Sequence, residues 1–345
     1  MKTFYSREHA QHCAQNENNR GRVVAAFERP ERADLIAAAI EAARIGPIES
    51  PAAAPLSSIL RIHDPSFVDF LQGAYREWLA LGRHGDALPM AWAIRGMRTD
   101  RSPRSLDGRL GFYSFDVGTP LTAGSWTAAK SAADSALAAA SHLTDGAHSA
   151  FALCRPPGHH AGADFFGGYC YLNNAAIAAQ SLLDRGASRI AILDVDYHHG
   201  NGTQAIFYAR SDVLYVSIHA DPATDYPFFL GFADEAGCGQ GCGYNVNLPL
   251  PAGTAWPAWS QALDLACRRI DEFGAGALVV SLGVDTFQGD PICSFQLASD
   301  DYVRMGSRIA ALGRPTLFVM EGGYAVAEIG VNTSNVLHGF EAGVG

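Results

Sequence analysis

The stretch IAILDVDYHHGNG at residues 190–202 constrains the fold more than any other part of the chain. Its first four residues are apolar on both faces, which is typical of a short strand buried inside a parallel sheet. Asp194, Asp196 and His198 follow at intervals of two residues, so they share one face if the strand continues. Carboxylate and imidazole groups at the carboxyl end of such a strand can hold a divalent metal, although the same residues also suit a polar turn that caps a helix.

Short apolar runs and helical patterns alternate along the rest of the chain. We expect further strands at residues 2–6, 149–153, 213–219, 277–284 and 316–320, and helices at residues 31–44, 66–81, 122–143, 171–185, 255–273, 300–312 and 325–340. Alternation of this kind predicts an α/β fold in which helices cover both faces of a mostly parallel central sheet. No fixed-period repeat and no linker divides the 345 residues, so we expect a single domain over residues 1–345.

Two segments break this alternation. Residues 9–22 are polar and are predicted to form a surface loop. Residues 82–120 mix glycine, proline and arginine with aromatic residues, show no clear period, and contain Met90, Ile94 and Met97. Because long irregular segments in compact domains are usually functional, residues 82–120 are predicted to form a subunit contact or a rim over the active site, with local packing as the alternative.

The charge and the cysteines limit the class of partner and the compartment. A formal net charge of −10 argues against nucleic acid, which needs a basic face, and favours a cationic substrate. The seven cysteines are odd in number and form no CxxC pair, which indicates a reducing compartment. No apolar stretch approaches the roughly 18 residues of a membrane span, and the first residues lack the apolar core of a signal peptide. We therefore expect a cytoplasmic protein that binds neither nucleic acid nor membrane.

Reactive residues follow three further predicted strands. His159 and His160, Asp285, and Tyr324 each come shortly after an apolar run. Ligands of open parallel sheets bind beyond the carboxyl ends of the strands. Each of these motifs is weak alone, but together they predict one site at that edge of the sheet.

The residue types at these strand ends suit a metal and a proton acceptor. Asp196, His198 and Asp285 offer two carboxylates and one imidazole, whose charge balances that of a divalent ion, and three protein ligands with an open position are typical of catalytic zinc. His159 and His160 are candidates for the base that activates water. The alternative for this histidine pair is a satisfied polar turn.

Three other residues can support this chemistry. Asp194 is not needed as a metal ligand, so it is free to orient one histidine, and Asn201 can hold the other. Tyr324 follows two glycines, which allow a close backbone approach, and its phenol can stabilise an oxyanion. Metal, histidine and phenol together describe the hydrolysis of an amide. A half-buried core tyrosine is the alternative for Tyr324.

Four motifs together resemble the histone deacetylase superfamily: RPPGHH at 155–160, DVDYHHGNGTQ at 194–204, SLGVDTF at 281–287 and EGGY at 321–324. Within it, the chain is most similar to the bacterial acetylpolyamine amidohydrolases. The similarity spans nearly the whole chain. It implies a three-layer arginase/deacetylase-like fold, and a use of residues 82–120 in dimerisation and in narrowing the entrance of the active site.

The resemblance also implies a role for each site residue. Asp196, His198 and Asp285 would bind one Zn²⁺ per subunit, and His159, His160 and Tyr324 would be catalytic, with Asp194 supporting His159 and Asn201 supporting His160. A structural K⁺ would lie against Asp194, Asp196, His198, Ser217 and Ile218. The substrate would contact Glu17, Asp107, Gly168, Tyr169, Tyr226 and Gly322.

The function that this resemblance implies is zinc-dependent removal of the acetyl group from small, cationic acetylated amines such as acetylputrescine and acetylcadaverine. One alternative keeps the chemistry and changes the substrate to acetyl-lysine in proteins. Another is a binding protein for acetylated ligands or polyamines without turnover. Arginase-like ureohydrolase activity is a fourth alternative, and it would need two metals.

Overall fold

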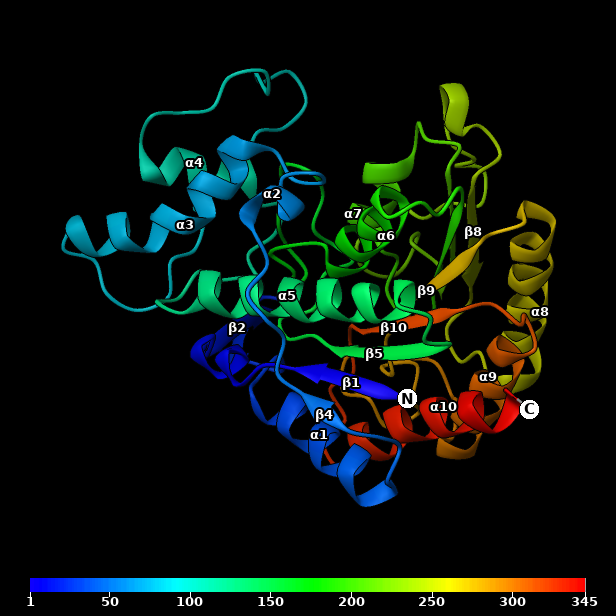
Figure 1. The fold of residues 1–345 in the computed structure, drawn as a ribbon. Coiled ribbons are helices and arrows are strands. Elements are labelled where there is room, and N and C mark those ends of the chain that lie inside the picture. The colour runs from blue at the N-terminus through cyan, green and yellow to red at the C-terminus, as the bar shows by residue number, and fades with distance from the viewer. Residues whose placement is uncertain (345) are drawn as a thin grey trace.

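Eight parallel strands form the central sheet in the computed structural model, which describes residues 1–344 (Figure 1). Their order across the sheet is β4-β1-β5-β10-β9-β6-β7-β8. The strands are β1 Lys2–Tyr5, β4 Ile48–Glu49, β5 Ser149–Leu153, β6 Ile190–Asp194, β7 Val213–Ala220, β8 Asn245–Leu250, β9 Ala277–Leu282 and β10 Thr316–Met320. The α/β fold class expected from the sequence is confirmed.

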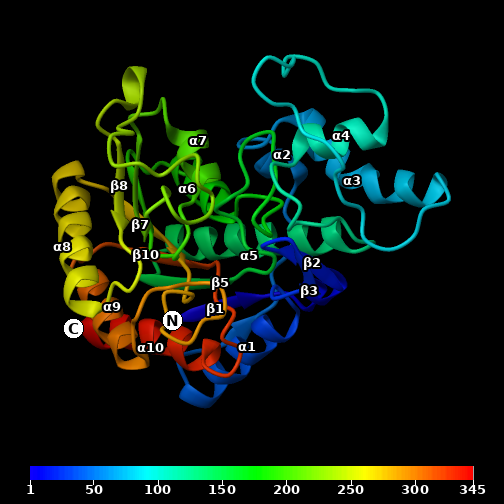
Figure 2. The ribbon, with the colours of Figure 1, turned by 180° about the vertical axis from the view of Figure 1, so that it is seen from behind.

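Strand β5 shows why both faces of the sheet are buried. Ala150 and Ala152 point into one hydrophobic cluster, whereas Phe151 and Leu153 point into another on the opposite face. Helices α3 (Pro65–Ala80), α5 (Ser125–Thr144) and α6 (Asn174–Asp184) pack on the first side, and α1 (Glu31–Ala43), α8 (Trp256–Phe273), α9 (Ser299–Ala310) and α10 (Ile329–Gly343) pack on the second. Figures 1 and 2 show α5 on one side of the strands and α1 and α10 on the other.

The remaining elements are short: η1 Arg7–Gln11, β2 Asn16–Asn19, β3 Arg22–Ala25, α2 Leu56–Ile59, α4 Leu106–Tyr113, α7 Asn201–Phe207 and η2 Gly239–Gly241. The expectation of a plain surface loop at 9–22 is wrong, because β2 and β3 pair as an antiparallel hairpin. Arg20 and Gly21 at its tip have φ of 51° and 80°, the backbone that a tight hairpin turn requires. No helix of residues 1–344 is long and apolar enough to cross a membrane.

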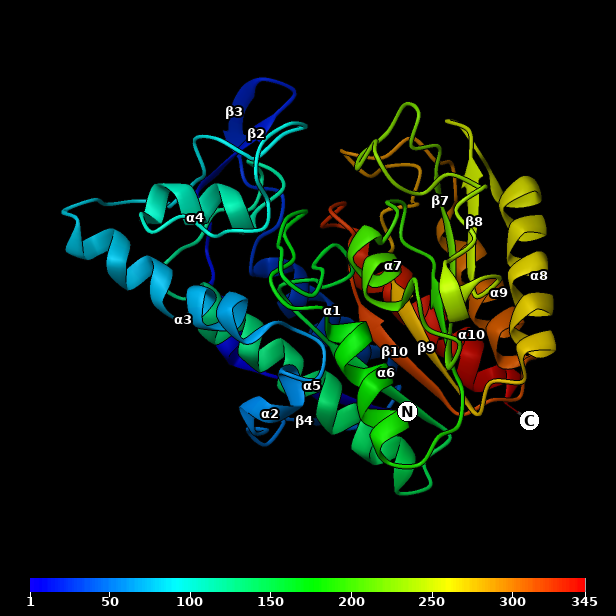
Figure 3. The ribbon, with the colours of Figure 1, turned by 90° about the horizontal axis from the view of Figure 1, so that it is seen from above.

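Seen from above, α3, α4 and the β2–β3 hairpin lie on one side of the molecule and α8 lies on the other (Figure 3). Strands β5, β10, β9 and β6 are consecutive neighbours in the sheet. The loops that follow these four strands therefore leave the same edge side by side, and they carry the reactive residues that the sequence singled out.

Candidate active site

Two carboxylates and an imidazole converge between the ends of β6 and β9. The ligand atoms of Asp196, His198 and Asp285 all lie within 4.8 Å of one another. His198 Nδ1 lies 3.3 Å from Asp196 Oδ1 and 3.1 Å from Asp285 Oδ2. Backbone amides hold both carboxylates, because Gly322 donates to Asp196 Oδ2 at 2.8 Å and Tyr197 donates to Asp285 Oδ1 at 2.8 Å.

The electrostatics of this group favour a cation between the carboxylates. Burial and the charge of Asp196 raise the pKa of Asp285 to about 7. Burial alone would lower the pKa of His198, but hydrogen bonds to Asp196 and Asp285 raise it to about 10. A divalent ion would supply positive charge that offsets the repulsion between the two buried carboxylates. Two carboxylates with one imidazole also match the ligand types of zinc. The residues therefore fit a divalent metal.

The two histidines after β5 have different partners. His159 Nδ1 donates to Asp194 Oδ2 at 3.0 Å, whereas His160 Nδ1 donates to the amide oxygen of Asn201 at 2.6 Å. Burial lowers the pKa of His159, but Asp194 and Asp196 outweigh it and raise the pKa to about 10. Burial and the charges of His159 and His198 hold the pKa of His160 well below its usual range. His160 is thus neutral, and its Nε2 can accept a proton.

Tyr324 lies in the loop after β10 and directly follows Gly322 and Gly323. Gly323 has φ of +132°, and a side chain at Gly322 would place its Cβ 2.5 Å from Asp285 Oδ2. Only glycine lets this loop pass the carboxylates so closely. The guanidinium of Arg32 lies 4.7 Å from the centre of the Tyr324 ring. Burial raises the pKa of the phenol above its usual range, so it remains a proton donor.

Aromatic rings surround the histidine pair. Tyr169 meets Tyr324 edge-on with ring centres 5.5 Å apart, and Tyr226 meets His160 edge-on at 5.2 Å. Gly168, with φ of +57°, leaves space for the His160 ring, because a Cβ at this position would lie 2.2 Å from His160 Cδ2. The substrate residues expected at 168, 169 and 226 thus lie beside the catalytic candidates.

Three residues near the end of the irregular segment 82–120 contact the site although no pattern in the sequence predicted them. Asp116 Oδ2 accepts hydrogen bonds from the Tyr226 hydroxyl and from Gly168 N, both at 2.7 Å. Phe115 stacks on Tyr226 at 6.0 Å, and Thr119 Oγ1 accepts from Tyr169 N at 2.8 Å. No periodicity marked these positions. Their role becomes visible only because tertiary packing brings the segment against both aromatic walls.

The two acids expected to contact the substrate have different surroundings. Glu17, on β2, is buried, and its Oε1 accepts from the Tyr169 hydroxyl at 2.8 Å. Burial raises the pKa of Glu17. Asp107, on α4, is partly exposed and forms two hydrogen bonds with the Arg83 guanidinium, one of them 2.9 Å long. The structure thus places Glu17 behind an aromatic wall, and Asp107 in a surface ion pair.

Three of the residues expected around K⁺ lie on two adjacent strands, whereas Asp196 and His198 lie in the loop after β6. Asp194 pairs in register with Ser217, and Ile218 is next on β7. Asp194 and Ser217 are fully buried. Their side-chain oxygens, with nearby backbone carbonyls, are the oxygen donors that a hard cation prefers.

A parallel sheet with metal-ligand, imidazole and phenol groups at its carboxyl edge defines a candidate metal-dependent hydrolase. Residues 26–340 match the family model described as "Histone deacetylase domain". The chain is 57% identical over 99% of both chains to "Acetylpolyamine amidohydrolase 2" of Pseudomonas aeruginosa, and 48% identical, over 98% of this chain and 99% of the relative, to "Acetylpolyamine amidohydrolase" of Mycoplana ramosa. The solved structure of acetylpolyamine aminohydrolase from Burkholderia pseudomallei superposes with a TM-score of 0.95, at 41% identity over 99% of both chains. The protein belongs to the histone deacetylase family.

Proposed function

We propose that the protein hydrolyses the acetyl amide of small N-acetylated diamines and polyamines, such as acetylputrescine and acetylcadaverine, to acetate and the free amine. The observation that carries the proposal is the convergence of Asp196, His198 and Asp285 beside a neutral His160 and a protonated Tyr324. Family membership and the names of the similar proteins support the reaction class.

Asp196, His198 and Asp285 would hold one zinc ion. A divalent metal bound there would supply a Lewis acid for the acetyl carbonyl and would make water more acidic. Amides of Gly322 and Tyr197 fix the orientation of the two carboxylates before any ligand arrives. Asp194 and Ser217, with backbone carbonyls of the neighbouring loops, would hold a structural K⁺ beneath this group.

The two histidines would divide the proton transfers. His160 donates Nδ1–H to Asn201, so its Nε2 lone pair is available to take a proton from the attacking water. His159, held by Asp194, keeps a positive charge beside the reacting carbon and stabilises the negative charge that develops there. The proton on His160 then passes to the departing amine nitrogen.

Tyr324 would stabilise the oxyanion. Its hydroxyl keeps its proton, and two glycines let the loop bring it close to the carboxylates. A phenol aimed at the developing charge acts more strongly in the transition state than in the ground state, which is the condition for catalysis.

The walls of the site favour a slender cationic chain. Tyr169 and Tyr226 would flank a methylene chain, and their hydroxyl groups donate hydrogen bonds to the acids Glu17 and Asp116. Asp107 would need a longer substrate or a second subunit to contribute. We also propose that residues 82–120 join two subunits, and that the protein is cytoplasmic, as its seven free cysteines suggest.

Acetate release by the zinc-loaded protein tests this function. N-acetylputrescine and N-acetylcadaverine are compared with an acetyl-lysine peptide, with Tyr324→Phe beside the wild type. We expect a preference for the diamines in kcat/KM, and a loss of about 10²–10³-fold in kcat for Tyr324→Phe. A preference for the peptide would keep the mechanism and replace the substrate with acetylated proteins. No turnover of either substrate would contradict the proposal.

A further inference from the structure

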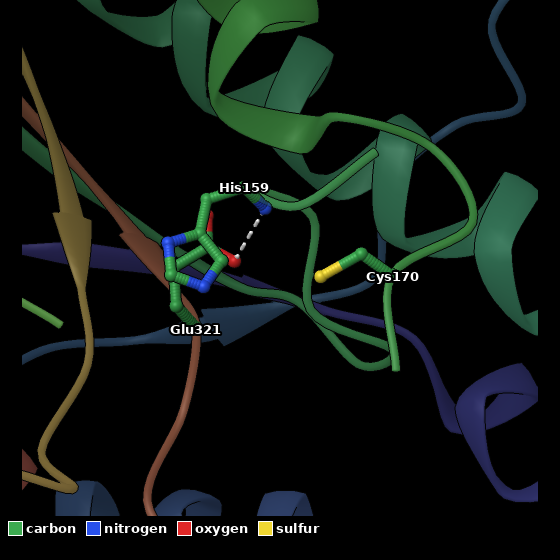
Figure 4. Close-up of side chains that lie close together, drawn as sticks. All are labelled: His159, Cys170 and Glu321. Carbon is green, nitrogen blue, oxygen red and sulfur yellow. Dashed lines mark hydrogen bonds between the residues drawn. The ribbon is translucent and has the colours of Figure 1, made fainter. Parts of the chain in front are cut away.

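A second group of metal-ligand residues includes one member of the histidine pair, His159. Side-chain ligand atoms of His159, Cys170 and Glu321 all lie within 4.8 Å of one another. Figure 4 shows the three side chains pointing toward one another from β5's loop, from the loop before α6 and from the end of β10. All three are buried, with Cys170 and Glu321 completely inaccessible.

One oxygen of this group lacks a partner. Glu321 Oε2 accepts hydrogen bonds from Gly158 N at 2.6 Å and His159 N at 3.1 Å, the second of which is drawn in Figure 4. Glu321 Oε1 has no hydrogen-bond partner among residues 1–344, although it is fully buried. Buried carboxylate oxygens are rarely left unpaired, because the loss of water costs free energy that only a new partner restores. This oxygen therefore calls for a ligand.

The other two ligand atoms are available as well. His159 uses Nδ1 for Asp194, and its Nε2, which carries a proton in the cationic ring and lies 3.8 Å from Asp196 Oδ1, would bind a metal by releasing that proton to solvent. The Cys170 thiol donates a weak hydrogen bond to Gly168 O at 3.3 Å, which a metal could replace. Metal–ligand bonds of about 2.0–2.3 Å require the three atoms to approach by roughly 1 Å, which side-chain rotation can provide.

We infer that His159, Cys170 and Glu321 form a second, weaker site for thiophilic divalent ions such as Cd²⁺ or Zn²⁺ in excess. Binding would release the Cys170 proton to solvent, and the resulting thiolate together with one carboxylate would neutralise the ion, which permits its burial. Thiolate, imidazole and carboxylate ligands suit zinc and softer ions, and they differ from the carboxylate-rich group of Asp196, His198 and Asp285.

Occupation of this second site would inhibit the enzyme. The ion would replace the Nε2 proton of His159, so this ring could no longer stabilise the negative charge that develops at the reacting carbon. This consequence rests on the proposed function, whereas the binding of the ion does not. The inhibition is therefore expected to be reversible with a chelator that removes the weaker ion first.

Cadmium titration of the zinc-loaded protein tests the site, in a background in which the exposed Cys13, Cys238 and Cys242 are replaced by serine. Three quantities are followed: zinc and cadmium bound per chain, the ultraviolet thiolate-to-cadmium charge-transfer band, and acetate release. We expect one Cd²⁺ to bind in addition to the retained zinc, with the charge-transfer band and the loss of activity rising together.

Two variants identify the ligands. Cys170→Ser is expected to lose the band and to need at least about tenfold more Cd²⁺ for inhibition. Cys154→Ser is the matched control, because Cys154 is equally buried but its thiol donates to Ala132 O on α5. Glu321→Gln keeps the thiol and is expected to weaken cadmium binding, which provides a second reading if Cys170→Ser fails to fold.

A band that persists in Cys170→Ser, or a cadmium ion that only displaces zinc, would overturn the inference. If the wild type turns over no acetylated amine, the proposed function fails, and the band and the bound metal per chain still decide on the site.

Discussion

At the scale of single residues, Asp116 connects two walls of the active site that come from distant parts of the chain. Its Oδ2 accepts from the Tyr226 hydroxyl and from Gly168 N. Hydrogen bonds to a charged acceptor contribute more than neutral ones, and their removal leaves buried donors unpaired. Asp116 therefore fixes the separation between the two aromatic rings that would hold the methylene chain.

We predict that Asp116→Ala lowers kcat/KM for an acetylated diamine by about tenfold or more, because loss of a charged hydrogen-bond partner costs roughly 1.5–3 kcal/mol. Tyr226→Phe, which removes only one of the two donors, is expected to have a smaller effect. Steady-state kinetics of both variants measure this, with Asp184→Ala, at the surface ion pair with Arg61, as the control. Unchanged kcat/KM in Asp116→Ala would mean that the walls hold their positions without the carboxylate.

Glu28 ties the acid stability of the protein to one buried cluster. Its carboxylate lies 2.8 Å from Arg32 Nη1 and 2.9 Å from Arg155 Nη2. Burial raises the pKa of Glu28, but the two guanidinium groups outweigh it and hold the pKa below the ordinary 4.5. A depressed folded-state pKa stabilises the fold above the unfolded pKa, and this contribution is lost as the pH falls through the folded pKa.

We therefore predict that Glu28→Gln lowers the free energy of unfolding at neutral pH by about 3–5 kcal/mol, because it removes the buried counter-charge of two guanidinium groups, which keep only their hydrogen bonds to backbone carbonyls. The difference between wild type and variant is expected to stay constant above pH 4.5 and to shrink below it, as Glu28 becomes protonated. Urea unfolding between neutral and acid pH measures this. A difference that grows on acidification would show that the sign is wrong.

The sequence predicted the residues that follow buried strands better than those that reach the site by packing. Asp196, His198 and Asp285 directly follow apolar runs, so the rule for strand ends places them together. Asp116 lies in a segment without periodicity, and its contacts depend on the path of a loop across the molecule. The orphaned oxygen of Glu321 likewise has no signature in the sequence, since it reflects only what surrounds it.

At the scale of elements, Asp290, in the segment after β9, accepts hydrogen bonds from the backbone of the loop that follows β10. Its Oδ2 accepts from Tyr324 N at 2.7 Å and Ala325 N at 3.2 Å, and its Oδ1 accepts from Ile292 N at 3.1 Å. The two glycines before Tyr324 have more conformational freedom than other residues, so the hydrogen bonds to Asp290 help to place the phenol, together with those of Arg32 to the backbone of the loop.

We predict that Asp290→Ala lowers kcat by up to about 10²-fold, because a displacement of about 1 Å at a reacting group has an effect of that size. KM should change little, since the aromatic walls are untouched. In a Tyr324→Phe background, the same substitution should cost almost nothing further, because its effect passes through the phenol. Equal losses in both backgrounds would indicate a general loss of structure instead.

The elements that the sequence predicted well are those buried on both faces. Strands β5, β6, β9 and β10 are fully buried and apolar at all but one position each, and each was expected within a few residues of its observed bounds. The edge strand β8 was missed because it alternates asparagine with apolar residues and contains proline. The β2–β3 hairpin and the helix α4 were not predicted, because their sequences show no clear hydrophobic periodicity and contacts with the rest of the fold stabilise them.

At the scale of the whole molecule, the last part of the segment 82–120 contacts the active site, whereas its earlier part exposes apolar side chains. Its last residues line the active site through Phe115, whereas Met90, Ile94 and Met97 are 77%, 65% and 60% exposed. Apolar side chains grouped on an irregular surface segment are typical of a protein interface. A subunit bound there would lie next to the entrance of the site and would restrict it to small substrates.

We predict that the protein is a dimer by light scattering, and that Met90→Glu, Ile94→Glu and Met97→Glu together make it monomeric, because buried charges without partners oppose association. Val331→Glu, at a 52% exposed position on α10, is the control and should remain dimeric. The monomeric variant should gain activity on an acetyl-lysine peptide relative to acetylputrescine, since the partner no longer narrows the entrance. A wild-type monomer with full activity on small substrates would contradict this prediction. The size of substrate that the site admits would then be set within one chain, by the two aromatic walls that Asp116 connects.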